Sequence, residues 1–162
     1  MTLRQKALAQ RIRLEIDALE QTTAAIDRHW QRAKTSGADQ DAFLNSVALN
    51  LHSFYNGLER TMELIALEMD GGTLGGETWH TELLRQMTME LPAVRPAVLS
   101  TEASQNLDEY RKFRHRVRNI YAIQLNPARM EYLVANLPSI WLQTRTELLA
   151  FANFLEGLEN HE

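Results

Sequence analysis

The sequence predicts an all-α protein, a bundle of about five helices in which the long helices run antiparallel. Glycine and proline are scarce, at 7 and 4 of 162 residues. Apolar residues recur at intervals of three and four over long stretches, a spacing that places them on one face of an α-helix. A chain of this length can form a core without metal ions or disulfides, so we expect a single domain over residues 1–162.

The first half of the chain predicts a helical hairpin. Two apolar stripes predict helices over residues 2–33 and 40–69, and the glycine-containing segment 34–39 separates them by a short turn. Antiparallel packing of the two helices is therefore expected. The stripes consist of Leu8, Ile12, Ile16, Leu19, Ile26 and Trp30, then Val47, Leu51, Phe54, Leu58, Met62, Ile65 and Met69.

Polar residues interrupt the second stripe at Tyr55, Asn56, Glu59 and Arg60. Charged residues in such positions usually face solvent. The alternative is that Tyr55, Asn56 and Glu59 flank an arginine site across the bundle, with the Glu59 carboxylate orienting a guanidinium group.

A glycine-rich connector and a short helix come next. Residues 70–76 (DGGTLGG) predict a flexible link and lack the Lys-Ser/Thr ending of a phosphate-binding loop. A helix is expected over residues 77–91, with His80 beside Trp79 in its first turn. A histidine there is more often a packing or hydrogen-bonding residue, but His80 is one candidate to supply an imidazole for proton transfer.

Pro92 and Pro96 predict an irregular crossing, because each proline disfavours helix in the residue before it. Ser100 or Thr101 is expected to cap the helix that follows.

The last helix is expected to begin cleanly at Asn126-Pro127, a capping residue followed by proline. Pro138 should break or kink it. Residues 156–162 are expected to form a frayed tail.

Basic residues crowd into the stretch 107–126 of a chain whose net charge is −4. If this stretch is a helix, Arg111, Arg114 and Arg118 lie along one edge of an apolar arc, with their guanidinium groups in a shared groove. Arginine offers a planar fork of donors, so the row suits phosphate or an acidic partner; the alternative is a solvated helix face. The apolar arc consists of Tyr110, Phe113, Val117, Ile120 and Tyr121.

The pattern Arg114-x4-Asn119-x-Tyr121 resembles the Arg-x4-His-x-Tyr motif of HepT-like HEPN ribonuclease toxins, with Asn119 in the histidine position. The segments SFYNGLERTMELIALEMDGG, ETWHTELLRQM, RPAVLS and LDEYRKFRH also follow in the order and spacing of that family, over most of residues 53–147. The resemblance implies a HEPN-like up-and-down bundle that forms a homodimer through the motif helix. It further implies a metal-independent RNA endonuclease, with tRNA as the expected substrate.

The resemblance also implies roles for individual residues. Arg114 would hold the scissile phosphate, and Asn119 would occupy the position of the general base. Asparagine does not exchange a proton near neutral pH, although it can orient a ribose hydroxyl or a phosphate by hydrogen bonds. His115 or His80 is therefore expected as the proton-transfer group. The expected RNA-binding and catalytic set is Arg111, Arg114, His115, Arg118, Asn119, Tyr121 and His80, supported by Tyr55, Asn56 and Glu59.

Members of the resembled family are paired with a minimal nucleotidyltransferase antitoxin in a toxin–antitoxin module. The resemblance makes Tyr121 the acceptor of AMP in adenylylation by that partner; the alternative for Tyr121 is an aromatic residue at the core edge. Two other functions stay open: a non-catalytic substrate-binding or regulatory subunit of a nucleotidyltransferase, and a helical interaction scaffold.

Composition excludes several other classes of protein. Cysteine is absent, and the five histidines lack the spacing of zinc ligands, so we expect no metal site and no cofactor. Overall acidity argues against a protein that binds nucleic acid over its whole surface. No apolar run is long enough to cross a bilayer, and we expect no membrane contact and a cytoplasmic location.

Overall fold

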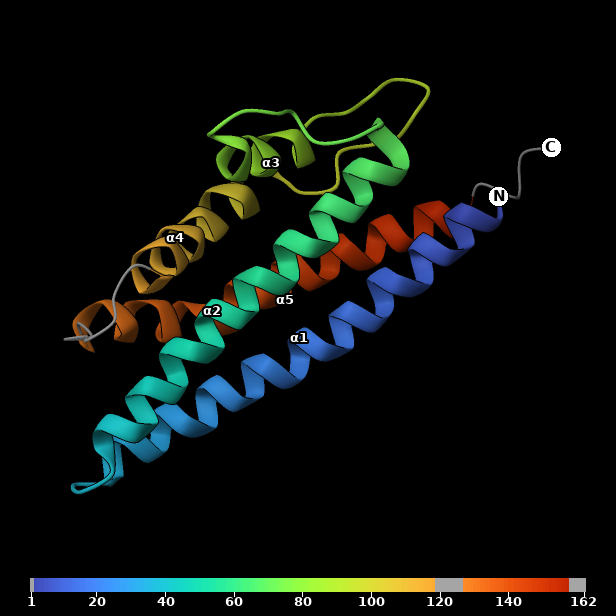
Figure 1. Ribbon diagram of the computed structural model, residues 1–162. Coiled ribbons are helices and arrows are strands. Elements are labelled where there is room, and N and C mark those ends of the chain that lie inside the picture. The colour runs from blue at the N-terminus through green and yellow to red at the C-terminus, as the bar shows by residue number, and fades with distance from the viewer. Residues whose placement is uncertain (1, 119–126, 158–162) are drawn as a thin grey trace.

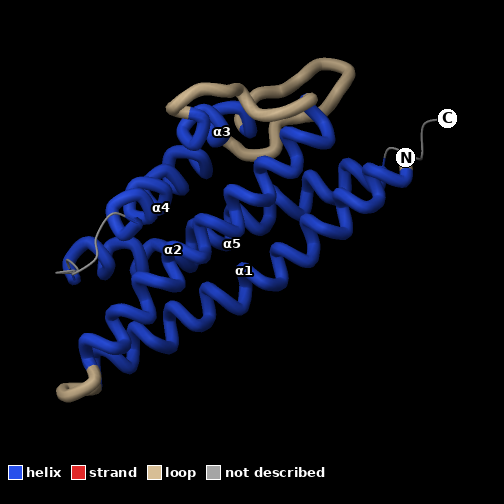
Figure 2. Tube along the Cα trace, in the orientation of Figure 1, coloured by secondary structure: helices blue, strands red, loops and turns tan. Residues whose placement is uncertain are grey.

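The computed structural model describes residues 2–118 and 127–157, and within these residues the regular structure consists of helices. Figure 1 shows their arrangement as a bundle, and Figure 2 shows that the loops gather at the turn between the first two helices and around the short third helix. The predicted all-α bundle is confirmed. The elements are α1 (Leu3–Thr35), α2 (Gln40–Ile65), the π-helical turn η1 (Ala66–Asp70), α3 (Trp79–Met87), α4 (Thr101–Arg118) and α5 (Pro127–Gly157).

Helices α1 and α2 form the predicted antiparallel hairpin, and α5 packs against α1 (Figure 1). Thr2 caps α1, since its side chain accepts a hydrogen bond of 3.2 Å from the backbone N–H of Gln5. The two helices approach closely at Gly57 on α2. A Cβ added there would lie 2.9 Å from Cδ2 of Leu19 and 2.5 Å from Oε1 of Glu15, so the absence of a side chain sets the helix spacing.

An aromatic cluster joins α2, α4 and α5 in the core. The ring of Phe54 meets Tyr110 and Trp141 edge-on, with centroids 5.6 and 5.9 Å apart. Such edge-to-face pairs are the favoured geometry of aromatic rings in protein interiors. The Tyr110 hydroxyl donates a hydrogen bond of 2.6 Å to the backbone oxygen of Leu133, which ties α4 to α5.

Arg95 organises the irregular chain beyond α2. Its Nε and Nη2 donate to the Asp70 carboxylate at 2.6 and 2.7 Å, and the two side chains are 0% and 4% exposed. Nη1 also donates to the backbone oxygen of Met89 at 2.8 Å. The predicted helix over 77–91 is therefore too long: α3 ends at Met87, because the chain beyond it turns to present its carbonyl to Arg95.

Helix α4 begins as predicted. The Ser100 hydroxyl accepts a hydrogen bond of 3.1 Å from the backbone N–H of Ala103, the geometry of an N-cap. The expected cap at Asn126 lies outside the described residues.

A break or a kink was expected at Pro138, and the break is wrong, because α5 runs through the proline as one helix. Proline cannot donate a hydrogen bond to the carbonyl four residues earlier. Leu137 and Trp141, however, are 3% and 5% exposed on the two sides of the proline. Packing of both halves of α5 into the core therefore keeps the helix in one piece.

The tail expected over residues 156–162 is wrong for its first two residues, which belong to α5. Glu156 is still helical, and its carboxylate accepts hydrogen bonds of 3.0 and 2.9 Å from Nε and Nη2 of Arg13 on α1. Residues 158–162 lie outside the described part of the chain. None of the described helices is both long and apolar enough to cross a membrane.

Candidate functional site

The motif arginine, Arg114, lies in the interface between α4 and α2. Its side chain is 6% exposed, and Glu59 on α2 is 8% exposed. Nη1 of Arg114 donates to Oε1 of Glu59 at 2.7 Å, and Nη2 donates to Oε2 at 3.0 Å. The fork of the guanidinium thus matches both oxygens of the carboxylate, which is the strongest geometry for such a pair.

Two further residues of α2 contact the guanidinium. Nη1 also donates to Oδ1 of Asn56 at 3.1 Å, and the guanidinium carbon lies 4.8 Å from the ring centre of Tyr55. The Asn56 side chain in turn meets Nδ1 of His52 at 3.1 Å. Positions 55, 56 and 59 share one side of α2 because residues three or four apart lie one turn along a helix.

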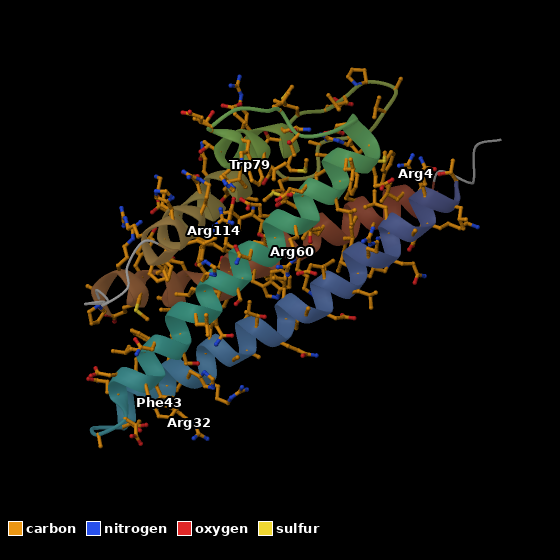
Figure 3. The ribbon with its side chains drawn as sticks, viewed as in Figure 1. Arg4, Arg32, Phe43, Arg60, Trp79 and Arg114 are labelled. Atoms are coloured by element: carbon orange, nitrogen blue, oxygen red, sulfur yellow. The ribbon has the colours of Figure 1, made fainter. Side chains whose placement is uncertain are left out.

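Helix α3 brings His80 to the same pair. Nδ1 of His80 lies 2.8 Å from Oε2 of Glu59 and 3.3 Å from Nη2 of Arg114. The imidazole stacks on Trp79, with ring centroids 3.6 Å apart. Figure 3 shows Trp79 and Arg114 on the same side of α2, and the side chain of His80 is 29% exposed. His80 is therefore more accessible to solvent than Glu59 or Arg114.

Burial dominates the electrostatics of this site. It raises the pKa of the Tyr55 hydroxyl above its usual value, and the negative charge of Glu59 adds to the effect. Burial also raises the pKa of Glu63, one helical turn beyond Glu59, with a further contribution from the Glu59 charge. The pair of Arg114 and Glu59 thus sits in a poorly solvated region where one carboxylate influences its neighbours.

Some polar atoms of the cluster lack partners. Among the described residues, the Tyr55 hydroxyl and Nε of Arg114 are buried without a hydrogen bond. Buried donors are almost always paired in proteins, and an unpaired one costs free energy.

The expected groove shared by three guanidinium groups is wrong for Arg114, which faces the core because α2 offers it a carboxylate. The contact expected under the alternative, in which Glu59 orients a guanidinium across the bundle, is present. Arg111 donates to Oδ1 of Asp108 at 2.6 Å and its side chain is 19% exposed. His115 is exposed on α4. The side chain of Arg118, and Asn119 and Tyr121, lie outside what the structure describes.

The structure thus brings together Arg114, Glu59, Asn56, Tyr55 and His80. Their roles stay predictions. Sequence reasoning missed Glu63, although its place four residues after Glu59 puts it one turn along the same helix face. Among the described residues, no group of three or more histidines and carboxylates could hold a metal ion.

A cavity of about 460 Å³ lies elsewhere, between α1 and α5, and none of the candidate residues lines it. Its walls include Ile26, Pro138 and Trp141. The candidate residues predicted from the sequence that the structure brings together thus lie in the polar cluster and not in this cavity.

Comparison with protein families gives one result that bears on these residues. A model described as HepT-like protein matches residues 46–155, more than half of the 162-residue chain. The chain belongs to the HepT-like family. The match begins on α2 and ends on α5, so all of the clustered residues lie within the HepT-like region. Comparisons with curated proteins and with solved structures give no match.

Proposed function

We propose that this HepT-like chain is the toxin of a HEPN toxin–antitoxin module and cleaves RNA, with tRNA as the substrate, without a metal ion. The observation that carries the proposal is the buried motif arginine, Arg114, held on both oxygens of Glu59 at 2.7 and 3.0 Å.

A buried ion pair is a poor way to stabilise a helix interface. Removing two charges from water costs several kcal/mol, and their attraction roughly offsets this cost. Apolar side chains of similar size often stabilise the same interface better. Because Arg114 also belongs to the motif, we assign the pair to chemistry and not to stability alone. It fixes a positive and a negative group, Asn56 and an imidazole within one small volume.

Arg114 takes a different role in this proposal from the phosphate contact expected from the motif. Because its guanidinium is occupied by Glu59 and Asn56, Arg114 positions the cluster and supplies its positive charge. Asn119 would orient a ribose hydroxyl or a phosphate oxygen. In a homodimer that pairs α4 with its counterpart, the two clusters would flank one RNA cleft.

The antitoxin in this proposal is a minimal nucleotidyltransferase that transfers AMP to Tyr121. A nucleotide on Tyr121 would add negative charge to the basic stretch of the chain and would compete with RNA phosphate. Mass spectrometry after incubation with a nucleotidyltransferase and ATP tests this step: adenylate on another residue, or on none, removes Tyr121 from the proposal.

The nuclease itself is tested by incubating the protein with total tRNA in EDTA. We expect cleavage by the wild type and loss of cleavage by Arg114→Lys, which keeps the charge but loses the fork. Arg116→Lys is the matched control, because Arg116 is exposed two residues along the same helix. Circular dichroism confirms that each variant is folded. No cleavage by the folded wild type rejects the proposal.

One observation favours a second function. Asparagine replaces histidine at position 119 of the motif, which suits a non-catalytic subunit that presents substrate to a nucleotidyltransferase. RNA binding at physiological salt without cleavage would support this function. Metal-independent cleavage by the wild type would exclude it.

A further inference from the structure

A histidine from outside the motif lies beside the motif arginine. His80 lies on α3, 34 residues before Arg114, yet its Nδ1 is within 3.3 Å of the guanidinium and 2.8 Å of Glu59. Stacking on Trp79 at 3.6 Å holds the plane of the imidazole. One side of the ring is thus fixed by three neighbours, while 29% of the side chain remains exposed.

Nδ1 cannot serve both of its polar neighbours at once. A neutral imidazole nitrogen either carries a proton and donates or lacks one and accepts. The contact with Oε2 of Glu59 is the shorter, at 2.8 Å against 3.3 Å for Arg114, and its acceptor is charged. Nδ1 therefore carries the proton and donates a hydrogen bond to Oε2 of Glu59.

This assignment leaves Nε2 of the neutral ring without a proton, so its lone pair is available to a substrate. A carboxylate that fixes the tautomer of a histidine in this way also stabilises the imidazolium formed when the ring takes up a proton. The Glu59 carboxylate contacts both His80 and Arg114, and it therefore links the imidazole to the motif arginine.

We propose that His80 is the general base of RNA cleavage, with Glu59 as its positioning residue; this inference rests on the proposed function. Nε2 takes the proton of a ribose 2′-hydroxyl, the 2′-oxygen bonds to phosphorus, and the bond from phosphorus to the 5′-oxygen breaks. The 5′-oxygen takes a proton from water, and the imidazolium releases its proton to solvent. The products are a 2′,3′-cyclic phosphate and a 5′-hydroxyl.

The charged groups that face His80 are known from both packed helices. Glu59 and Glu63 lie on α2, and Arg114 lies on α4. Charges of both signs therefore surround the imidazole.

The test measures tRNA cleavage in EDTA by His80→Ala with and without added imidazole. We expect a loss of about 10²- to 10⁴-fold relative to the wild type, the usual contribution of a general base. Free imidazole should restore part of the rate, because it can occupy the space beside Trp79. A merely structural histidine gives no such rescue. The control is His29→Gln: His29 bonds Ser46 at 2.6 Å near the other end of the hairpin, and the rate should not change.

The outcomes separate the two proposals. If the wild type cleaves tRNA and His80→Ala retains its rate within about threefold, far less than a general base contributes, the assignment of His80 is overturned while the nuclease stands. The same holds if His115→Gln, and not His80→Ala, loses activity. If the folded wild type does not cleave tRNA, the proposed function is wrong, and the assignment of His80 as general base is wrong with it.

Discussion

Glu59 on α2 and Arg114 on α4 lie 55 residues apart in sequence and are joined by two hydrogen bonds, of 2.7 and 3.0 Å, in a setting from which water is almost excluded. Without Arg114, the partner that remains for Glu59 among the described residues is His80, and without Glu59, Arg114 retains a hydrogen bond to the uncharged Asn56. The free energy of unfolding and the candidate chemistry therefore depend on the same contact. Substitutions of Arg114 and Glu59, alone and together, can measure the two effects separately.

The first prediction concerns the energy of this pair. Arg114→Met should lower the free energy of unfolding by about 3–5 kcal/mol, because it leaves a buried carboxylate without its partner. The double variant Arg114→Met, Glu59→Leu should recover most of that loss. Urea unfolding of the singles and the double forms a double-mutant cycle, with Arg116→Met as the exposed control. Costs that simply add would show that the pair is not coupled.

A second prediction concerns the pair of Asp70 and Arg95. Asp70→Asn should cost about 3–5 kcal/mol, because it leaves the Arg95 charge buried and unpaired. Hydrogen exchange in residues 71–78 should accelerate. The control is Glu82→Gln, since the pair of Glu82 and Arg85 is exposed and long at 3.8 Å, and should cost less than about 1 kcal/mol. Equal effects of the two substitutions would contradict the role given to Arg95.

Glycine at position 57 provides a third test. Gly57→Ala should destabilise the protein by about 1–3 kcal/mol through overpacking, because buried Leu19 must move away from the new methyl group. Gly37→Ala is the matched control: no atom lies within 4 Å of its added Cβ. That change should be neutral or slightly stabilising. Thermal unfolding of the two variants gives the comparison, and a neutral Gly57→Ala would place the two helices further apart than described.

The fourth prediction contrasts two buried tyrosines. Tyr110→Phe removes a hydrogen bond of 2.6 Å to Leu133 and should cost about 1 kcal/mol. Tyr55→Phe removes a hydroxyl that has no partner among the described residues, and should be neutral or stabilising. Urea unfolding at pH 7 measures both. A larger loss for Tyr55→Phe would indicate a partner for that hydroxyl.

A fifth prediction follows from the pKa of the same tyrosines. Burial raises the pKa of Tyr55 and of Tyr110. An unfolded tyrosine ionises at about pH 10, so above that pH the unfolded chain binds fewer protons than the native one, and the free energy of unfolding falls as pH rises. Below about pH 10 these residues should contribute no pH dependence. Urea unfolding between pH 8 and about 11 should show a shallower decline in the double variant Tyr55→Phe, Tyr110→Phe than in the wild type.

The long helices could be predicted because their information is local. Apolar residues such as Ile12 and Leu51 recur with the period of a helix, and both are fully buried. Ser100 caps α4 by a hydrogen bond to a residue three positions away. Of the break or kink expected at Pro138, the break does not occur, because the rule on proline is also local whereas the core contacts of Leu137 and Trp141 are not.

The members of the site were predicted, and its arrangement was one of two alternatives. A helical wheel places Arg114 on the edge of an apolar arc, and the sequence alone does not decide between a solvent-facing Glu59 and one that binds a guanidinium across the bundle. The burial of Arg114 depends on that contact between distant segments. His80 was one of two histidine candidates, and its proximity to Glu59 distinguishes it only in three dimensions.

The placement of the cluster on α2, α3 and α4, with none of its members on α1, has a consequence for the order of folding. Glu59 reaches His80 across 21 residues and Arg114 across 55. A hairpin of α1 and α2 alone therefore contains the carboxylate without its guanidinium, and the cluster assembles only when α3 and α4 dock on α2. A chain that has not yet folded past α3 does not contain the site.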